Sequence, residues 1–138
     1  MAVQFNKPVY DFLGYKLIKV NFNRLNDGLL EKFSISISNN DIDDNSKIYS
    51  FFINVTMYFK DNVESKFEFL TAFLINDMEW FNSLNSTFGD SMFFSVVFPF
   101  IRQKINELCD DSRESVKIPI VNLKNTNLCK EVVFILNK

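Results

Sequence analysis

Residues 96–109 read VVFPFIRQKINELC, the pattern of an amphipathic helix that contains a proline. From Ser91 onward, apolar residues recur at three- and four-residue spacings, and Arg102 and Glu107 fall on the opposite side. The residues predicted to face the core are Phe93, Val97, Phe100, Ile101, Ile105 and Leu108. A proline inside a helix removes a backbone donor and crowds the carbonyl group four residues earlier. We therefore expect Pro99 to lie in the opening turns, where the chain leaves a sheet.

Two segments ahead of this helix alternate apolar and polar side chains. Residues 15–23, YKLIKVNFN, and residues 33–38, FSISIS, each predict a strand with one face toward a core. The side chains expected to point inward are Ile18, Val20, Phe22, Phe33, Ile35 and Ile37. Residues 39–46, NNDIDDNS, predict a polar loop that is long enough for the chain to cross over instead of making a tight hairpin.

Residues 48–60, IYSFFINVTMYFK, and residues 66–76, KFEFLTAFLIN, predict a β-hairpin that turns at Asp61 and Asn62. Both faces of this hairpin are apolar. One face holds Phe51, Ile53, Val55, Met57, Phe59, Phe67, Phe69, Phe73 and Ile75. The other face includes Phe52, Tyr58, Leu70 and Leu74. Helices on one face alone would leave the second face in water, so we expect a second layer there, most economically a partner subunit.

The C-terminal part of the chain predicts two short elements. Residues 116–123, VKIPIVNL, are expected to be extended because Ile118 precedes Pro119. Residues 127–137 predict a short helix with Leu128, Val132, Val133 and Leu136 on one face, and a strand built on VVFIL is the alternative. The predicted fold is thus α+β: a four-stranded antiparallel sheet, a long amphipathic helix and a short C-terminal helix. At 138 residues, we expect one domain over residues 1–138.

Composition excludes several classes of function. The net charge is −2 and no segment is rich in lysine or arginine, so nucleic-acid binding is not expected. The N-terminal residues lack the pattern of a secretory signal, and no apolar run is long enough to span a bilayer. We therefore expect a cytoplasmic protein without membrane insertion. Cys109 and Cys129 show no metal-binding or redox spacing.

The residue types that common catalytic sites require are also scarce. The chain has no histidine, which excludes a histidine base, a Ser-His or Cys-His pair and an imidazole metal site. With three glycines it has no phosphate-binding loop. Asp41, Asp43 and Asp44 lack the glycine and the final glutamate of a calcium loop. We predict that the protein is not an enzyme and uses no cofactor or metal.

Two short motifs and the order of the elements carry a resemblance to a known family. Residues 98–102, FPFIR, open the long helix, and residues 118–123, IPIVNL, follow it. They are similar to the Phe-Pro-Tyr-Ala-Arg and Leu-x-Pro-x-Asn-Phe segments of the bacterial export chaperone SecB and its wider family. The similarity extends from about Tyr15 to the C-terminus. This chain departs from the family pattern at residues 112–115, SRES, and residues 78–81, MEWF, where family members carry glycines.

The resemblance implies a dimer, or a dimer of dimers, that holds non-native polypeptides in long hydrophobic grooves without ATP. Such a chaperone or adaptor would serve protein export or one client, such as an aggregation-prone antitoxin. No acidic patch aligns with the surface that docks the translocase motor. An alternative is a SecB-like scaffold dedicated to one folded partner, for instance a mobile-element or phage protein that blocks a host enzyme or defence.

The client groove is expected between residues 39–46 and the C-terminal segments. Its predicted lining is Phe52, Tyr58, Leu70, Leu74, Leu123, Leu128 and Val132. Aromatic and aliphatic surface of this kind recognises hydrophobicity instead of a sequence motif, so it accepts many client segments. Each of these residues has an alternative role in the core or in a subunit interface.

Overall fold

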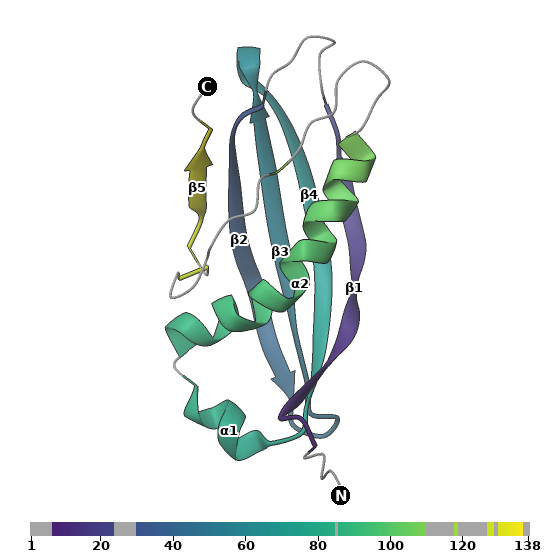
Figure 1. Cartoon of the computed structure of the whole chain (residues 1–138), viewed down its shortest axis with the longest axis vertical. Helices are drawn as coiled ribbons and strands as arrows, with labels where there is room; N and C mark the ends of the chain where they lie inside the picture. The colour runs from purple at the N-terminus through teal and green to yellow at the C-terminus, as the bar shows by residue number, and fades with distance from the viewer. Residues whose placement is uncertain are drawn as a thin grey trace, which may run out of the picture.

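The computed structural model describes residues 7–23, 30–84, 86–109, 118, 127–128 and 130–136. Within these ranges a five-stranded antiparallel sheet carries helices on one face (Figure 1). The elements are β1 (Tyr10–Asn21), β2 (Leu30–Asp43), β3 (Ile48–Phe59), η1 (Lys60–Asn62), β4 (Val63–Ile75), α1 (Met78–Ser83), α2 (Ser86–Cys109) and β5 (Val132–Ile135). The strand order is β1-β4-β3-β2-β5. The α+β class is as predicted, but the sheet has five strands instead of four.

The central hairpin of β3 and β4 is confirmed. The two strands pair from Ile48 and Leu74 to Phe59 and Val63, and the short η1 turn joins them. Its core-facing side chains are buried, and they are Phe51, Ile53, Val55, Met57, Phe59, Phe67, Phe69, Phe73 and Ile75. The FSISIS strand also points Phe33, Ile35 and Ile37 into the core as predicted. The alternation of apolar and polar residues predicted the buried face of these strands correctly, because the strands pair with each other over most of their length.

The predicted crossover loop at residues 39–46 is wrong. β2 continues through Asp43, which pairs with Ile48, so β2 and β3 form a hairpin with a tight turn at residues 44–47. The register shifts between Ser38 and Asp41, where Asn39 adopts a positive φ of 53°. A bulge of this kind places two polar residues inside a strand without ending it.

The predicted inward face of β1 is right in direction for Val20, which pairs with the buried Phe67, but wrong in burial. Ile18, Val20 and Phe22 are 44%, 47% and 41% exposed. Register shifts between Phe12 and Gly14 and between Leu17 and Lys19 interrupt the alternation. Because each slip of one residue exchanges the two faces of a strand, the periodicity could not be extended across them. The β1 side chains that pack against the core are Tyr10, Phe12, Tyr15 and Leu17.

Helix α2 crosses the core face of the sheet and changes direction part-way along its length (Figure 1). It begins at Ser86, so Pro99 lies well inside the helix and not in its opening turns as predicted. A proline at such a position is a usual cause of a bend, because it removes one hydrogen bond of the helix. Both halves of α2 contact the sheet, through Phe93 with Phe73 and through Cys109 with Met57.

The α2 residues predicted to face the core divide into two groups. Phe93, Val97, Ile101 and Ile105 are buried. Phe100 and Leu108 are 47% and 41% exposed, so their assignment to the core face is wrong. Phe100 lies on the flank of the helix, where its ring stacks on those of Phe12 and Tyr15 from β1. Leu108 belongs to the last turn of α2. The buried residues that the prediction missed are Phe94, Phe98 and Cys109.

The predicted C-terminal helix over residues 127–137 is wrong, and the strand alternative is right. Val132–Ile135 form β5, which pairs with β2 between Lys32 and Ile35. β-branched and aromatic residues favour a strand when a sheet edge is open to receive them. Helix α1 was not predicted; it begins where the Asp77 side chain accepts a hydrogen bond from the backbone N–H of Trp80 at 3.0 Å.

Candidate protein-binding surfaces

The face of the sheet opposite α2 carries an apolar group that we call the second-face patch. It consists of Leu13, Ile48, Phe52, Leu70, Ala72 and Leu74. Phe52 pairs with Leu70, and Ile48 pairs with Leu74. These side chains lie outside the core cluster, and Leu13 is 52% exposed. A shallow hollow of about 230 Å³ lies between β1 and β4, and Leu13, Leu70 and Ala72 are among its lining residues. Within the described residues, no helix lies over this face (Figure 1).

Polar side chains bound the second-face patch along the strands. Next to the pair of Phe52 and Leu70 comes the pair of Asn54 and Glu68, followed by Thr56 and Lys66. Asn54 donates from Nδ2 to the Ser38 hydroxyl at 3.0 Å. The second face is thus apolar toward one end of the sheet and polar toward the other, so only one end offers an apolar docking surface.

The structure does not gather the predicted groove residues into one groove. It brings together Phe52, Leu70 and Leu74. Tyr58 lies beyond the polar rows, where Lys32 Nζ is 4.9 Å from its ring centroid. Leu128 is fully buried in the core, and Val132 packs against the core from β5. Leu123 lies outside the described residues. The prediction missed Leu13, which also belongs to the patch. Leu13 lies at the register shift between Phe12 and Gly14, and the local sequence does not indicate this shift.

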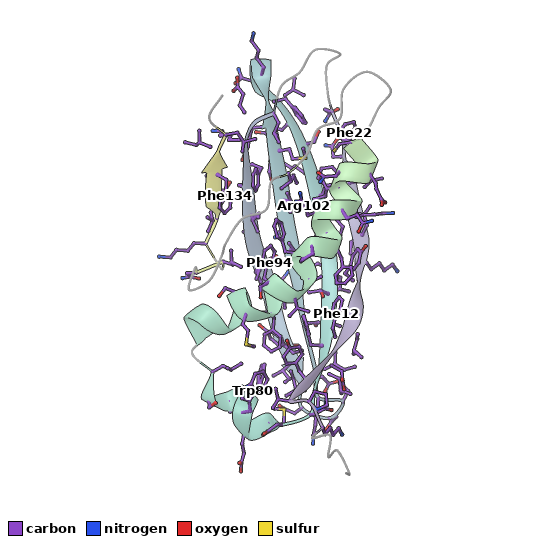
Figure 2. All side chains as sticks on the ribbon, viewed as in Figure 1. Phe12, Phe22, Trp80, Phe94, Arg102 and Phe134 are labelled. Carbon is purple, nitrogen blue, oxygen red and sulfur yellow. The ribbon has the colours of Figure 1, made fainter. Side chains whose placement is uncertain are left out.

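A second exposed apolar group lies at the β1 edge of the sheet. The strand order leaves one side of β1 without a neighbouring strand among the described elements. We call the exposed residues Ile18, Val20 and Phe22, together with Phe100 from α2, the edge patch. Figure 2 shows Phe22 beside the last turns of α2. Exposed apolar side chains at an unpaired sheet edge are typical of a protein interface.

A buried polar cluster joins the sheet to α2. The Tyr49 hydroxyl donates a hydrogen bond to Asp90 Oδ1, and Asn40 Nδ2 donates to Asp90 Oδ2 at 3.0 Å. Asp90 is 5% exposed. At the turn between β2 and β3, the backbone N–H of Asn45 and the Ser46 side chain hold the pKa of Asp43 below its usual value. In the described part of the chain, histidine, cysteine and carboxylate side chains do not gather in threes around a possible metal position.

Comparison with known proteins bears on the fold. No protein-family model and no curated protein match the sequence. A solved structure that matches is the SecB-like chaperone Rv1957 of Mycobacterium tuberculosis in complex with a ChAD peptide from the Rv1956 HigA1 antitoxin. The match covers 82% of this chain and 90% of that chain, with a TM-score of 0.60 and 12% identity. The chain has a SecB-like fold.

The SecB-like fold agrees with the family resemblance of the FPFIR and IPIVNL motifs. At 12% identity the likeness concerns the backbone arrangement, so the binding surfaces of this chain follow from its own side chains. The SecB-like sheet here presents the second-face patch and the edge patch. Among its described helices, none is both long and apolar enough to cross a membrane.

Proposed function

We propose that this protein is an ATP-independent SecB-like chaperone or adaptor that binds non-native polypeptide segments. The observation that carries the proposal is the second-face patch: the sheet packs α2 on one face and presents Phe52, Leu70 and Leu74 on the other. The SecB-like neighbour, which was solved with an antitoxin peptide, supports a protein partner.

Phe52, Leu70 and Leu74 suit extended client chains for a physical reason. A client segment that covers them removes apolar surface from water, which stabilises the complex by about 25 cal/mol for each Å². The hollow that the described residues form on this surface is shallow, so it does not select one residue type. It therefore recognises apolar segments of many sequences, as a chaperone requires.

We propose that the chain acts in the cytoplasm as one SecB-like domain over residues 1–138, without a cofactor. It assembles as a homodimer or homotetramer. The edge patch supports this assembly, because an unpaired apolar edge strand is readily continued by the same strand of a second copy.

The chaperone role is tested by light scattering. Substoichiometric protein is added to a chemically unfolded polypeptide on dilution, and aggregation is expected to fall. Leu70→Ser is expected to lose this suppression, whereas Lys66→Ser, on the same face and strand but in the polar rows, is expected to keep it. Unchanged scattering with excess oligomer, or full activity of Leu70→Ser, would contradict the proposal.

A dedicated binder of one folded partner is the second candidate. The observation that favours it is the sharp polar boundary of the second-face patch at Asn54 and Glu68, which gives the patch a defined outline. A pull-down that yields one stoichiometric partner, undiminished by competing unfolded protein, would select this candidate over a general chaperone.

A further inference from the structure

The backbone of the C-terminal segment follows the outer edge of β2. In β5, Val132 pairs with Ile35 and Ile135 pairs with Lys32. Beyond the strand, the N–H of Leu136 donates to the Glu31 carbonyl oxygen at 2.9 Å. Before the strand in the sequence, the carbonyl oxygen of Leu128 accepts a hydrogen bond from the N–H of Ile37 at 2.7 Å. The edge of β2 thus binds an extended backbone from Lys32 to Ile35, with one further hydrogen bond at Glu31 and one at Ile37.

Successive side chains of this segment point alternately toward the core and toward solvent. The Phe134 ring stacks on Phe33 with centroids 4.9 Å apart, and Val132 and Leu136 also pack against the core (Figure 2). Val133 and Ile135 point away and are 48% and 74% exposed. The site therefore accepts apolar residues at every second position, which is the pattern recognised when a peptide adds a strand to a sheet edge.

β5 is held more weakly than the other strands. It has four residues and is the last strand in the sheet order, so β2 is its one strand neighbour among the described elements. In contrast, β2 pairs with β3 along most of its length. A short edge strand opens at a much lower free energy than a central one. When β5 leaves, Phe33 and Ile35 lose their cover, and the vacated edge favours another apolar strand.

We propose that the edge of β2 is a binding site for an extended partner segment with apolar residues at alternate positions, and that β5 occupies this site in the free chain. The inference rests on the proposed protein-binding function and adds a site to the second-face patch. β5 is then a built-in competitor that a partner segment must displace. Displacement restricts binding to segments whose inward residues pack at least as well as Val132, Phe134 and Leu136.

The site is tested with dye-labelled peptides and the full-length chain, using fluorescence anisotropy. A peptide with the sequence of residues 130–136, KEVVFIL, is expected to bind saturably. Replacing two of its three inward residues, Val132 and Phe134, by asparagine is expected to abolish binding. Replacing its outward residues, Val133 and Ile135, by serine is expected to leave binding intact. Equal binding of the two altered peptides, or no binding of KEVVFIL, would overturn the proposal.

Competition by β5 is tested in the chain itself. Phe134→Ala in the full-length protein weakens β5, so more of the chain has an open edge and the apparent Kd for KEVVFIL is expected to fall roughly tenfold. Val132→Ala, a smaller change in the same inward row, serves if the first variant does not fold. An apparent Kd that stays the same in a folded variant would show that β5 does not compete.

The outcomes separate this site from the proposed chaperone function. Leu70→Ser is expected to keep the difference in binding between the two altered peptides, because Leu70 lies on the second face and not on the edge of β2. Suppressed aggregation without peptide binding refutes the edge site alone, and peptide binding without suppressed aggregation refutes the chaperone role alone. A mass increase in Phe134→Ala without peptide binding would assign the edge to a second copy and overturn the proposal.

Discussion

Arg102 on α2 donates a hydrogen bond from Nε to the carbonyl oxygen of Ile118 at 2.7 Å. One turn further along the helix, Asn106 Oδ1 accepts a hydrogen bond from the N–H of the same residue at 2.8 Å. Ile118 is fully buried, so both of its backbone polar groups need partners inside the protein. These two side chains therefore hold Ile118, the first residue of the IPIVNL motif, to α2, and Arg102 is the last residue of the FPFIR motif.

Asn106→Ala is expected to lower the free energy of unfolding by about 1–3 kcal/mol, because it leaves the buried N–H of Ile118 without its acceptor. Urea denaturation measures the loss. The matched control is Gln103→Ala on the same helix, since Gln103 is exposed and bonds the exposed Glu107 at 3.2 Å. The control is expected to change stability by less than about 0.5 kcal/mol. Equal effects of the two variants would contradict the anchoring role of Asn106.

Two phenylalanines of α2 are expected to differ strongly when truncated. Phe94 is fully buried and stacks on Phe98 with centroids 5.1 Å apart, so Phe94→Ala is expected to cost about 3–5 kcal/mol. Phe100 is 47% exposed on the flank of the helix, so Phe100→Ala is expected to cost about 1 kcal/mol. Chemical denaturation of the two variants measures both losses. A larger loss of stability for Phe100→Ala than for Phe94→Ala would contradict the assignment of Phe94 to the buried face of α2.

The fold could be predicted where the hydrophobic period runs unbroken. The core faces of β3 and β4, and of β2 between Lys32 and Ser38, followed from alternation alone, because no register shift interrupts the pairing there. The period failed at the bulges of β1 and on either side of Pro99 in α2, where Phe98 is buried and Phe100 is exposed. A bulge or a bend changes which nearby side chains face the core, and the position of a bulge depends on pairing with distant segments.

The candidate site was predictable in part for the same reason. The pairing of Phe52 with Leu70 on the second face followed from the hairpin register. The placement of Leu128 in the core and of Val132 on β5 did not, since both depend on the C-terminal segment reaching the edge of β2. The spacing of VVFIL fits a helix or a strand, and the open edge of β2 decides between them.

Tyr49→Phe is expected to lower stability by about 1.5–3 kcal/mol, because it removes a buried hydrogen bond to the Asp90 carboxylate that ties β3 to α2. Thermal or urea unfolding measures the effect. Tyr58→Phe is the control, since the Tyr58 hydroxyl makes a solvent-exposed bond to Glu131 at 3.4 Å. A loss confined to Tyr58→Phe would show that the cluster around Asp90 does not hold the helix to the sheet.

The turn between β2 and β3 is expected to weaken in acid. The pKa of Asp43 is lower in the folded chain than in the unfolded chain, because its carboxylate accepts hydrogen bonds from the backbone N–H of Asn45 and then from the Ser46 side chain. The carboxylate of Asp43 therefore stabilises the fold at a pH above its pKa in the unfolded chain. This stabilisation is lost as the pH falls through its pKa in the folded chain.

Unfolding measured from neutral to acid pH is expected to show a shallower decline for Asp43→Asn than for the wild type. Asp44→Asn makes the same change in net charge at the neighbouring exposed position and controls for it. The same pH dependence in the wild type and Asp43→Asn would contradict a stabilising carboxylate at this turn.

The edge patch is expected to hold two copies of the chain together through β1. Val20 is 47% exposed on a strand whose outer side has no partner strand among the described elements, so pairing with a second β1 would bury it. Val20→Lys places a charge at that position, and lysine on an edge strand opposes edge-to-edge pairing. Light scattering coupled to size exclusion is expected to give a multiple of the monomer mass for the wild type and the monomer mass for Val20→Lys. Lys19→Ala, at the next residue of β1, is expected to keep the oligomer. An oligomer of Val20→Lys at the same concentration would move the subunit interface away from β1, and the second-face patch would then be the remaining large apolar surface for it.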